Sequence, residues 1–428
     1  MKILHINTHD VGGAGKACLR LHEGLIERGV FSKSLILSSK KNYSLEKNIE
    51  VFNTNSVSHK KQENIITRGL KELGICENEN LKRQAIKAIT PNPIETFTFP
   101  TSNYDITLHP AYTEADIIHL HWVSGFFDYS FFNKNTKPVV WTLHDMNPFT
   151  GGCHYSNNCE GYKTGCFNCP MLELINLSNY AHESFSYKRK NLTSKVPLHI
   201  VPLSKWINVC SSKSSLLGKY PHTIIPNGIN STVFKIYPPE ESRKLFNLPL
   251  DKKVLSFVSQ SIDNNRKGSS YIYESIKALK HIPDVIFCII GKRSNKFNSD
   301  HVVQLGEIDD EDFMAKVYSA CDALLLPSKE DNLPNTAIES LLCGTPVIGF
   351  NVGGIPDIIN TGENGYLSEE INSTDFIVKI QHFLANGVSL TREKIRTRAT
   401  ESYDISTSVN KYITLYEEII KPHQLIYS

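Results

Sequence analysis

The chain lacks two features that would place it in a specialised class: a strong charge of one sign and a long apolar run. Its 428 residues carry a net charge of only +2, which argues against a protein that binds nucleic acid by charge alone. No apolar stretch approaches the roughly 20 residues that a membrane-spanning helix needs. The first residues, MKILHINTHD, are interrupted by His5, Asn7 and His9, and so predict a buried strand instead of a signal peptide. We therefore expect a cytoplasmic protein without a nucleic-acid partner.

Two common nucleotide-binding motifs are also missing. The glycine-rich segment DVGGAGKA, which contains Gly12, Gly13 and Gly15, lacks the first Gly and the final Ser or Thr of a P-loop. It also lacks the G-x-G-x-x-G spacing of a dinucleotide site. The pattern still predicts a turn after the first strand, in which the backbone can approach a ligand closely.

Alternating strands and helices are present twice along the chain. In the first half we expect strands at 2–7, 34–37, 115–123, 138–145 and 198–204, with an early helix that buries Ala17, Leu19, Leu21, Leu25 and Ile26. In the second half we expect strands at 253–259, 284–291, 301–306, 323–327 and 346–350. Such alternation indicates α/β domains with parallel sheets. The length suits two of them, here 1–225 and 243–405, joined by a proline-containing linker at 226–242 and followed by a helix at 406–428.

Residues 40–110 depart from this alternation. They are polar, with a weak amphipathic helical pattern near 65–73 and both basic and acidic residues between Lys60 and Lys87. We favour a surface insertion. The alternative is a patch that contacts the anionic cytoplasmic face of the inner membrane.

The segment from Pro327 to Leu367 is the most informative in the chain. Pro334 suits the first turn of a helix over 335–342, which Gly344 would end. Asp331 then lies in the loop before the helix, and Glu339 lies within it. The amides of Asn335 and Thr336 at the helix start would attract phosphate. The layout predicts a site for a nucleoside diphosphate, with carboxylates left for ribose and sugar hydroxyls.

This segment resembles the E-x7-E motif of the retaining glycosyltransferases of family 4, followed in order by GTPVIGF and GGIPDII. Asp331 replaces the first Glu and Glu339 matches the second. The resemblance implies a GT-B fold, in which two Rossmann-like domains face each other across a cleft and a C-terminal helix crosses back to the first domain. It also implies a nucleotide-sugar donor, UDP- or GDP-hexose, with Glu339 on the ribose and Asp331 on the sugar. In that family the glycine-rich loop at Gly13 and Gly15 faces the donor phosphates.

Two adjacent cations follow the first strand of the second domain. Arg266 and Lys267 lie in the loop 260–268, where ligands of open α/β sheets bind. They suit a diphosphate and would stabilise the leaving group, so catalysis needs no metal ion. The family resemblance gives RKG the same role. We expect the loops around Gly291, Lys292 and Glu307 to set the donor specificity.

His144 follows the strand 138–145 and is the candidate catalytic residue of the first domain. A histidine at the carboxyl end of a parallel strand can reach a ligand, and the resembled family uses a histidine here to hydrogen-bond the donor sugar. The alternative is a core histidine capped by its neighbour Asp145. His121 is a weaker candidate, for which we favour a structural role.

Four cysteines cluster after His144, in the pattern C-x5-C-x6-C-x2-C. In a reducing compartment, Cys153, Cys159, Cys166 and Cys169 can close a tetrahedral, structural Zn²⁺ site. Two disulfides or four free thiols are the alternatives.

The sequence thus predicts a retaining hexosyltransferase that acts on a lipid-linked glycan during the synthesis of a surface polysaccharide, such as O-antigen, capsule or exopolysaccharide. No residue stands out as a covalent nucleophile, so the family implies same-face attack by the acceptor hydroxyl. We place the enzyme at the cytoplasmic face of the inner membrane. The alternatives are a nucleotide-sugar epimerase of the same fold and a non-catalytic, zinc-stabilised subunit of a polysaccharide assembly complex.

Overall fold

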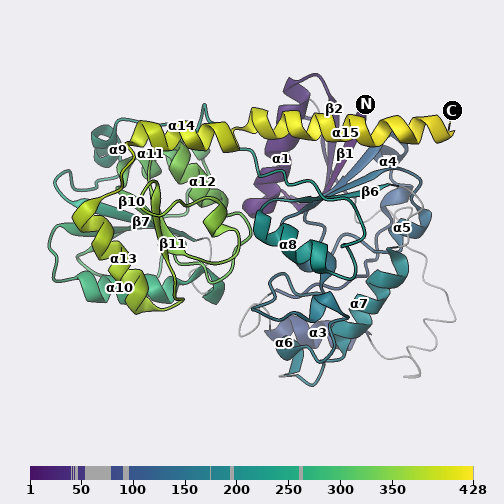
Figure 1. The fold of residues 1–428 in the computed structure, drawn as a ribbon, viewed down its shortest axis with the longest axis horizontal. Coiled ribbons are helices and arrows are strands. Elements are labelled where there is room, and N and C mark those ends of the chain that lie inside the picture. Colours follow the sequence, from purple (N-terminus) through teal and green to yellow (C-terminus); the bar gives the residue numbers. More distant parts are fainter. Residues whose placement is uncertain are drawn as a thin grey trace. The chain divides into compact units, whose positions relative to one another are not determined.

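The chain forms two compact units in a computed structural model that describes residues 1–39, 41, 43, 47–53, 79–89, 96–173, 175–192, 197–259 and 264–427 (Figure 1). The first unit comprises Met1–Ile225 and Val409–Ser428, and the second comprises Pro226–Ser408. Residues 226–242, for which the sequence suggested a linker, therefore group with the second unit. Among the described residues, no helix is long and apolar enough to cross a membrane.

The first unit is built on a parallel sheet of six strands in the order β3-β2-β1-β4-β5-β6. Its strands are β1 (Lys2–His9), β2 (Phe31–Ser38), β3 (Ile49–Val51), β4 (Ile117–Leu120), β5 (Val139–Leu143) and β6 (Leu198–Pro202). Its helices are α1 (Gly12–Glu27), α3 (Glu79–Ile89), α4 (Pro110–Glu114), α5 (Phe131–Lys134), α6 (Pro170–Glu173), α7 (Tyr180–Asn191) and α8 (Lys205–Lys213).

The second unit repeats this strand order, with six parallel strands arranged β12-β11-β10-β7-β8-β9. Its strands are β7 (Lys253–Ser259), β8 (Val285–Gly291), β9 (Val302–Gly306), β10 (Ala323–Leu326), β11 (Val347–Phe350) and β12 (Gly365–Ser368). Its helices are α9 (Pro239–Leu245), α10 (Ser269–Leu279), α11 (Glu311–Ala320), α12 (Asn335–Leu342), α13 (Ser373–Asn386) and α14 (Arg392–Tyr403). The last helix, α15 (Ile405–Tyr427), begins in the second unit and continues into the first. The predicted α/β class with two Rossmann-like parallel sheets is confirmed.

The glycine-rich segment differs from its prediction as a turn. Gly12, Gly13 and Gly15 form the first turn of α1, which has no side-chain cap. A Cβ at Gly15 would lie 2.5 Å from the carbonyl oxygen of His9, so the helix start packs directly on the end of β1. The predicted inward face of α1 is also partly wrong, because Ile26 is exposed while His22 is fully buried.

The region 40–110 is more than a surface insertion. Ile49–Val51 adds strand β3 to the sheet beside β2. Phe52, Phe97 and Phe99 are buried, and Phe97 forms an antiparallel bridge with Cys153. The predicted amphipathic pattern near 65–73 lies outside the described residues.

Candidate functional site

The candidate site of the second unit lies at the carboxyl edge of its sheet. Strand β7 has β8 on one side and β10 on the other, and the chain changes direction between them. In open α/β sheets, ligands bind outside the carboxyl ends of the strands at such a point. Arg266 and Lys267 follow β7, and Asp331 follows β10, so the topology brings all three to this edge.

These three side chains form one ionic group, in which Asp331 is buried and the two cations are half-buried. The Lys267 Nζ lies 2.6 Å from the Asp331 Oδ2, and an Arg266 guanidinium nitrogen lies 3.7 Å from the same oxygen. Asp331 is only 6% exposed. Burial alone would raise the pKa of the Asp331 carboxyl, but the charges of Lys267 and Arg266 hold that pKa below its ordinary value. Asp331 therefore stays ionised and neutralises part of the cationic pair.

Two glycines explain how the loops come this close. Gly268 has φ +74°, and a Cβ there would lie 1.9 Å from the carbonyl oxygen of Pro327. Gly353, after β11, has φ +58°, and its Cβ would lie 2.1 Å from the carbonyl oxygen of Asp331. Only glycine fits a left-handed backbone with such neighbours. The Gly in RKG and the first Gly in GGIPDII thus hold the cations and the carboxylate together.

Helix α12 begins at Asn335 and ends at Leu342, as predicted, and Gly344 follows with φ +71°. Pro334 directly precedes the helix instead of forming part of its first turn, and no side chain caps the start. The amides of Asn335 and Thr336 therefore belong to the first turn, beside the segment that carries Asp331. The side chain of Asn335 accepts a hydrogen bond of 2.9 Å from Asn227.

Glu339 lies in the interior of α12 and is 7% exposed. Its Oε2 accepts a hydrogen bond of 3.2 Å from the Tyr318 hydroxyl, which fixes the carboxylate against α11. Gly291 is the last residue of β8 and has φ +133°. Lys292 and Glu307, expected near the specificity loops, are exposed after β8 and β9. The ribose role of Glu339 stays a prediction.

In the first unit, His144 follows β5 and is half-buried. Its Nε2 lies 3.2 Å from the Nδ1 of His121. Burial lowers the pKa of His144 to about 4, so the ring is neutral near pH 7. Asp145, the neighbour expected to cap His144 if it were structural, instead binds the Nδ1 of His154 at 2.5 Å and accepts a hydrogen bond of 2.6 Å from the Trp122 indole.

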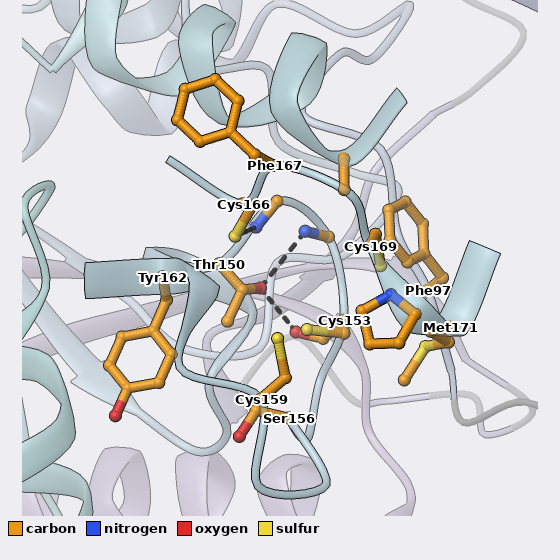
Figure 2. A pocket seen from close by; sticks show the side chains of 14 residues that line it. Phe97, Thr150, Cys153, Ser156, Cys159, Tyr162, Cys166, Phe167, Cys169 and Met171 are labelled. Atoms are coloured by element: carbon orange, nitrogen blue, oxygen red, sulfur yellow. Dashed lines mark hydrogen bonds between the residues drawn. The ribbon is translucent and has the colours of Figure 1, made fainter. Parts of the chain in front are cut away.

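The four cysteines of the Cys-rich block line one pocket of the first unit (Figure 2). Cys153, Cys159, Cys166 and Cys169 are free thiols, which contradicts the alternative of two disulfides. The amide of Gly151 donates to the Cys166 sulfur at 3.1 Å. The amide of Gly161 donates to the Cys159 sulfur at 3.4 Å.

Sequence reasoning missed several residues that shape these sites. Gly268 and Gly353 stood inside quoted motifs, where a positive φ could not be seen without the structure. His5 was noted only as an interruption of the first strand, yet its Nδ1 lies 2.9 Å from the Nε2 of His121. The signal for His5 and His121 was alternation, because polar residues at every second strand position share one face.

Comparisons with known proteins agree with this architecture. Residues 252–386, which contain Arg266, Lys267, Asp331 and Glu339, match the family model described as glycosyl transferases group 1. The putative colanic acid biosynthesis glycosyl transferase WcaC of Escherichia coli K12 is 25% identical over 98% of this chain and all of its own length. An N,N'-diacetylbacillosaminyl-diphospho-undecaprenol alpha-1,3-N-acetylgalactosaminyltransferase of Campylobacter jejuni is 27% identical over 45% of this chain and 53% of its own length.

Solved structures share the fold along almost the whole chain. Sucrose-phosphate synthase of Thermosynechococcus elongatus superposes with a TM-score of 0.66 at 17% identity, covering 98% of this chain and 99% of its own. Anabaena HepE, solved in complex with UDP, gives a TM-score of 0.62 at 14% identity and covers 98% of this chain and 100% of its own. The family match over residues 252–386, the full-length relative and the two six-stranded parallel sheets support one conclusion: the chain has the two-domain GT-B fold and resembles the glycosyltransferases of family 4.

Proposed function

We propose that this glycosyltransferase moves a hexose, with retention of configuration, from UDP- or GDP-hexose to a lipid-linked glycan. The observation that carries the proposal is the ionic group of Arg266, Lys267 and buried Asp331 at the carboxyl edge of the second sheet. Two cations and the start of α12 suit a diphosphate, and a carboxylate beside them suits sugar hydroxyls.

The ion pair suggests how the nucleotide-sugar donor is bound. When no donor is bound, Asp331 pairs with a cation that a phosphate would bind, because the Lys267 Nζ lies 2.6 Å from the Asp331 Oδ2. An arriving diphosphate competes for Lys267 and Arg266 and frees the Asp331 oxygens to accept hydrogen bonds from the sugar. The same cations then stabilise the charge that develops on the leaving diphosphate.

In the proposed reaction, the acceptor hydroxyl forms a new bond to the anomeric carbon as the bond to the diphosphate breaks on the same face. The leaving phosphate oxygen takes the proton of the hydroxyl, so no separate base is required. The anomeric configuration of the product, read by NMR, tests retention. An inverted product would contradict it.

The acceptor is proposed from the relatives. One is named for colanic acid biosynthesis, and another for a diphospho-undecaprenol acceptor. We therefore place the reaction at the cytoplasmic face of the inner membrane, during synthesis of a surface polysaccharide.

Two measurements test the function. A thermal-shift screen of nucleotide sugars should identify the donor, since a ligand at 100 times its Kd stabilises the protein by about 2.7 kcal/mol. Release of nucleoside diphosphate from that donor should then require membrane lipids that carry the acceptor. Conversion of the sugar without any acceptor would instead indicate an epimerase, and no turnover at all would indicate a non-catalytic subunit.

We also propose that Cys153, Cys159, Cys166 and Cys169 hold a structural Zn²⁺. All four thiols line the pocket in Figure 2, and two of their sulfurs accept backbone N–H bonds, from Gly151 and Gly161. The spacing, which ends in C-x2-C, suits a closed site of four sulfur ligands, and outer hydrogen bonds of this kind orient metal ligands. Among the described residues no three of these four sulfurs lie within 4.8 Å of one another, so binding of the ion would draw the thiols together.

Metal analysis of the purified chain should find one Zn²⁺ per chain, and Cys169→Ser should lose it. Cys210→Ser is the matched control, because Cys210 is also buried in the first unit but lies in α8, outside the pocket. Chelation should lower the Tm of the wild type. A metal-free wild-type protein that is stable in chelator would remove the proposal.

A further inference from the structure

A row of polar residues crosses one face of the first sheet. His5 of β1, His119 of β4 and Thr142 of β5 are fully or almost fully buried. The neighbouring positions along the same strands, such as Leu4 and Trp141, carry apolar side chains. His121 and His144 continue the row where β4 and β5 end. Burying so many polar groups is unfavourable unless they bind one another, so the contacts within the row must be specific.

Three imidazoles of this row are joined nitrogen to nitrogen. The Nδ1 of His5 lies 2.9 Å from the Nε2 of His121, and the Nδ1 of His121 lies 3.2 Å from the Nε2 of His144. Burial lowers the pKa of all three rings, so each is neutral near pH 7. A neutral imidazole carries one N–H and one bare nitrogen. The two hydrogen bonds must therefore run in the same direction along the row.

Only two proton arrangements satisfy this condition. In the first, His144 donates from Nε2 to His121, which donates from Nε2 to His5, and His5 is left with an N–H at its own Nε2. In the second, every ring carries its proton on Nδ1, and the Nε2 of His5 is bare. The tautomer of His144 is thus tied to that of His5, two rings away.

The surroundings of His5 distinguish the two arrangements. The Nε2 of His5 is buried and has no hydrogen-bond partner. His22 cannot serve as its acceptor, because its two ring nitrogens are paired with the Ser32 hydroxyl and the Lys47 carbonyl oxygen. His119 cannot either, since its nitrogens pair with the hydroxyls of Tyr416 and Thr142.

Cys18 and Ser34 remain near this end of the row; Ser34 pairs in register with His5 on the neighbouring strand, but the Nε2 of His5 forms a hydrogen bond with neither its hydroxyl nor the Cys18 thiol. Ligand atoms of His5, Cys18 and His121 all lie within 4.8 Å of one another. A thiol is a weak donor, and burial raises the pKa of Cys18 to about 12, so it keeps its proton. A bare, buried Nε2 at His5 is less unfavourable than a buried N–H without an acceptor.

We propose that His5 and His121 are positioning residues that hold His144 as the neutral Nδ1–H tautomer. In this tautomer the Nδ1 of His144 carries the proton, while its Nε2 accepts a hydrogen bond from His121. The tautomer itself follows from the hydrogen bonds of the row and the surroundings of His5. Its use, a hydrogen bond from Nδ1–H to a hydroxyl of the donor sugar, rests on the proposed glycosyltransfer.

The tautomer can be observed directly by long-range ¹H–¹⁵N NMR of the full chain labelled with ¹⁵N-histidine, with the His144 signals assigned by their loss in His144→Gln. We expect the wild type to show a protonated Nδ1 and a bare Nε2 at His144. His121→Phe removes the imidazole that joins His5 to His144, so in this variant we expect the His144 proton to move largely to Nε2. His199→Gln is the matched control, because His199 lies on β6 and pairs with Thr223, outside the row.

A wild-type His144 protonated at Nε2 would overturn the proposal without any variant, and so would an unchanged His144 pattern in a folded His121→Phe. The role in catalysis is read separately. His121→Phe should lower kcat roughly tenfold with little change in the donor KM. If His144 shows the expected tautomer but the chain never turns over a nucleotide sugar, the proposed function is refuted, whereas the positioning role of His5 and His121 stands.

Discussion

At the residue scale, Asp331 is the most informative side chain, because it is buried, ionised and bound to the cations proposed for the diphosphate. A substitution at this position should affect nucleotide binding and sugar transfer differently. In Asp331→Asn, Lys267 and Arg266 lose their internal counter-charge, so we expect UDP or GDP to bind as tightly as to the wild type or more tightly. Sugar transfer should fall by about 100-fold or more, since roughly 2.7 kcal/mol of sugar contact is lost. Parallel loss of nucleotide affinity and turnover would contradict this assignment.

Gly353 offers a second residue-scale prediction with a control built into the chain. Gly353 and Gly362 both have positive φ, of +58° and +84°, so alanine costs roughly 1–2 kcal/mol of backbone strain at either position. Only at Gly353 does the new Cβ collide, with the backbone of Asp331, while nothing lies within 4 Å at Gly362. Gly353→Ala should weaken nucleotide binding at least about tenfold, or ~1.4 kcal/mol, as measured by calorimetry. Gly362→Ala should keep wild-type affinity, and equal losses in both would refute the argument.

At the scale of elements, strands β1 and β4 and the residues that directly follow β4 and β5 include histidines whose pKa lies below the ordinary value of 6.5 because they are buried. For His144 the folded value is about 4. Between about pH 4 and pH 6.5 the unfolded chain binds more protons than the folded one. The free energy of unfolding therefore rises with pH over this window, and this stability is lost as the pH falls through it. Each such histidine contributes a slope of up to about 1.4 kcal/mol per pH unit.

Urea unfolding of the first unit can be followed by tryptophan fluorescence, because Trp122, Trp141 and Trp206 all lie in it. Between pH 6.5 and 5, His5→Gln should reduce the pH slope of stability by about one proton. His382→Gln, an exposed position in α13 of the second unit, should leave the slope unchanged. The interpretation fails if the slope of His5→Gln equals that of the wild type.

The same elements show what the sequence could predict. The long buried strands and α12 were predicted within a few residues, because hydrophobic runs bounded by Gly and Pro mark them clearly. Strands β3 and β12 were missed, since IEV and GYLS are too short and too polar to show a pattern. The start of α1 was predicted as a turn because glycine is a poor helix former, whereas packing on the end of β1 requires it there.

At the scale of the whole molecule, the two units share one strand order but differ in what their carboxyl edges carry: ion-paired cations in the second and linked histidines in the first. The sequence identified the second site because its residues lie in compact motifs. It could not predict the histidine row, whose members come from three strands that only the fold brings together. The free state of the four cysteines likewise required the structure, because spacing alone allowed disulfides.

The central claim is that Arg266 and Lys267 bind the diphosphate of the donor, and calorimetric titration of the full chain with UDP and GDP tests it most directly. Lys267→Ala should weaken binding of the preferred nucleotide about 10- to 100-fold, because a charge-assisted hydrogen bond contributes roughly 1.5–3 kcal/mol. Lys253→Ala is the control, since Lys253 begins β7 at the opposite edge of the sheet and pairs with Asp322. Wild-type affinity in Lys267→Ala, or an equal loss in Lys253→Ala, would contradict the account.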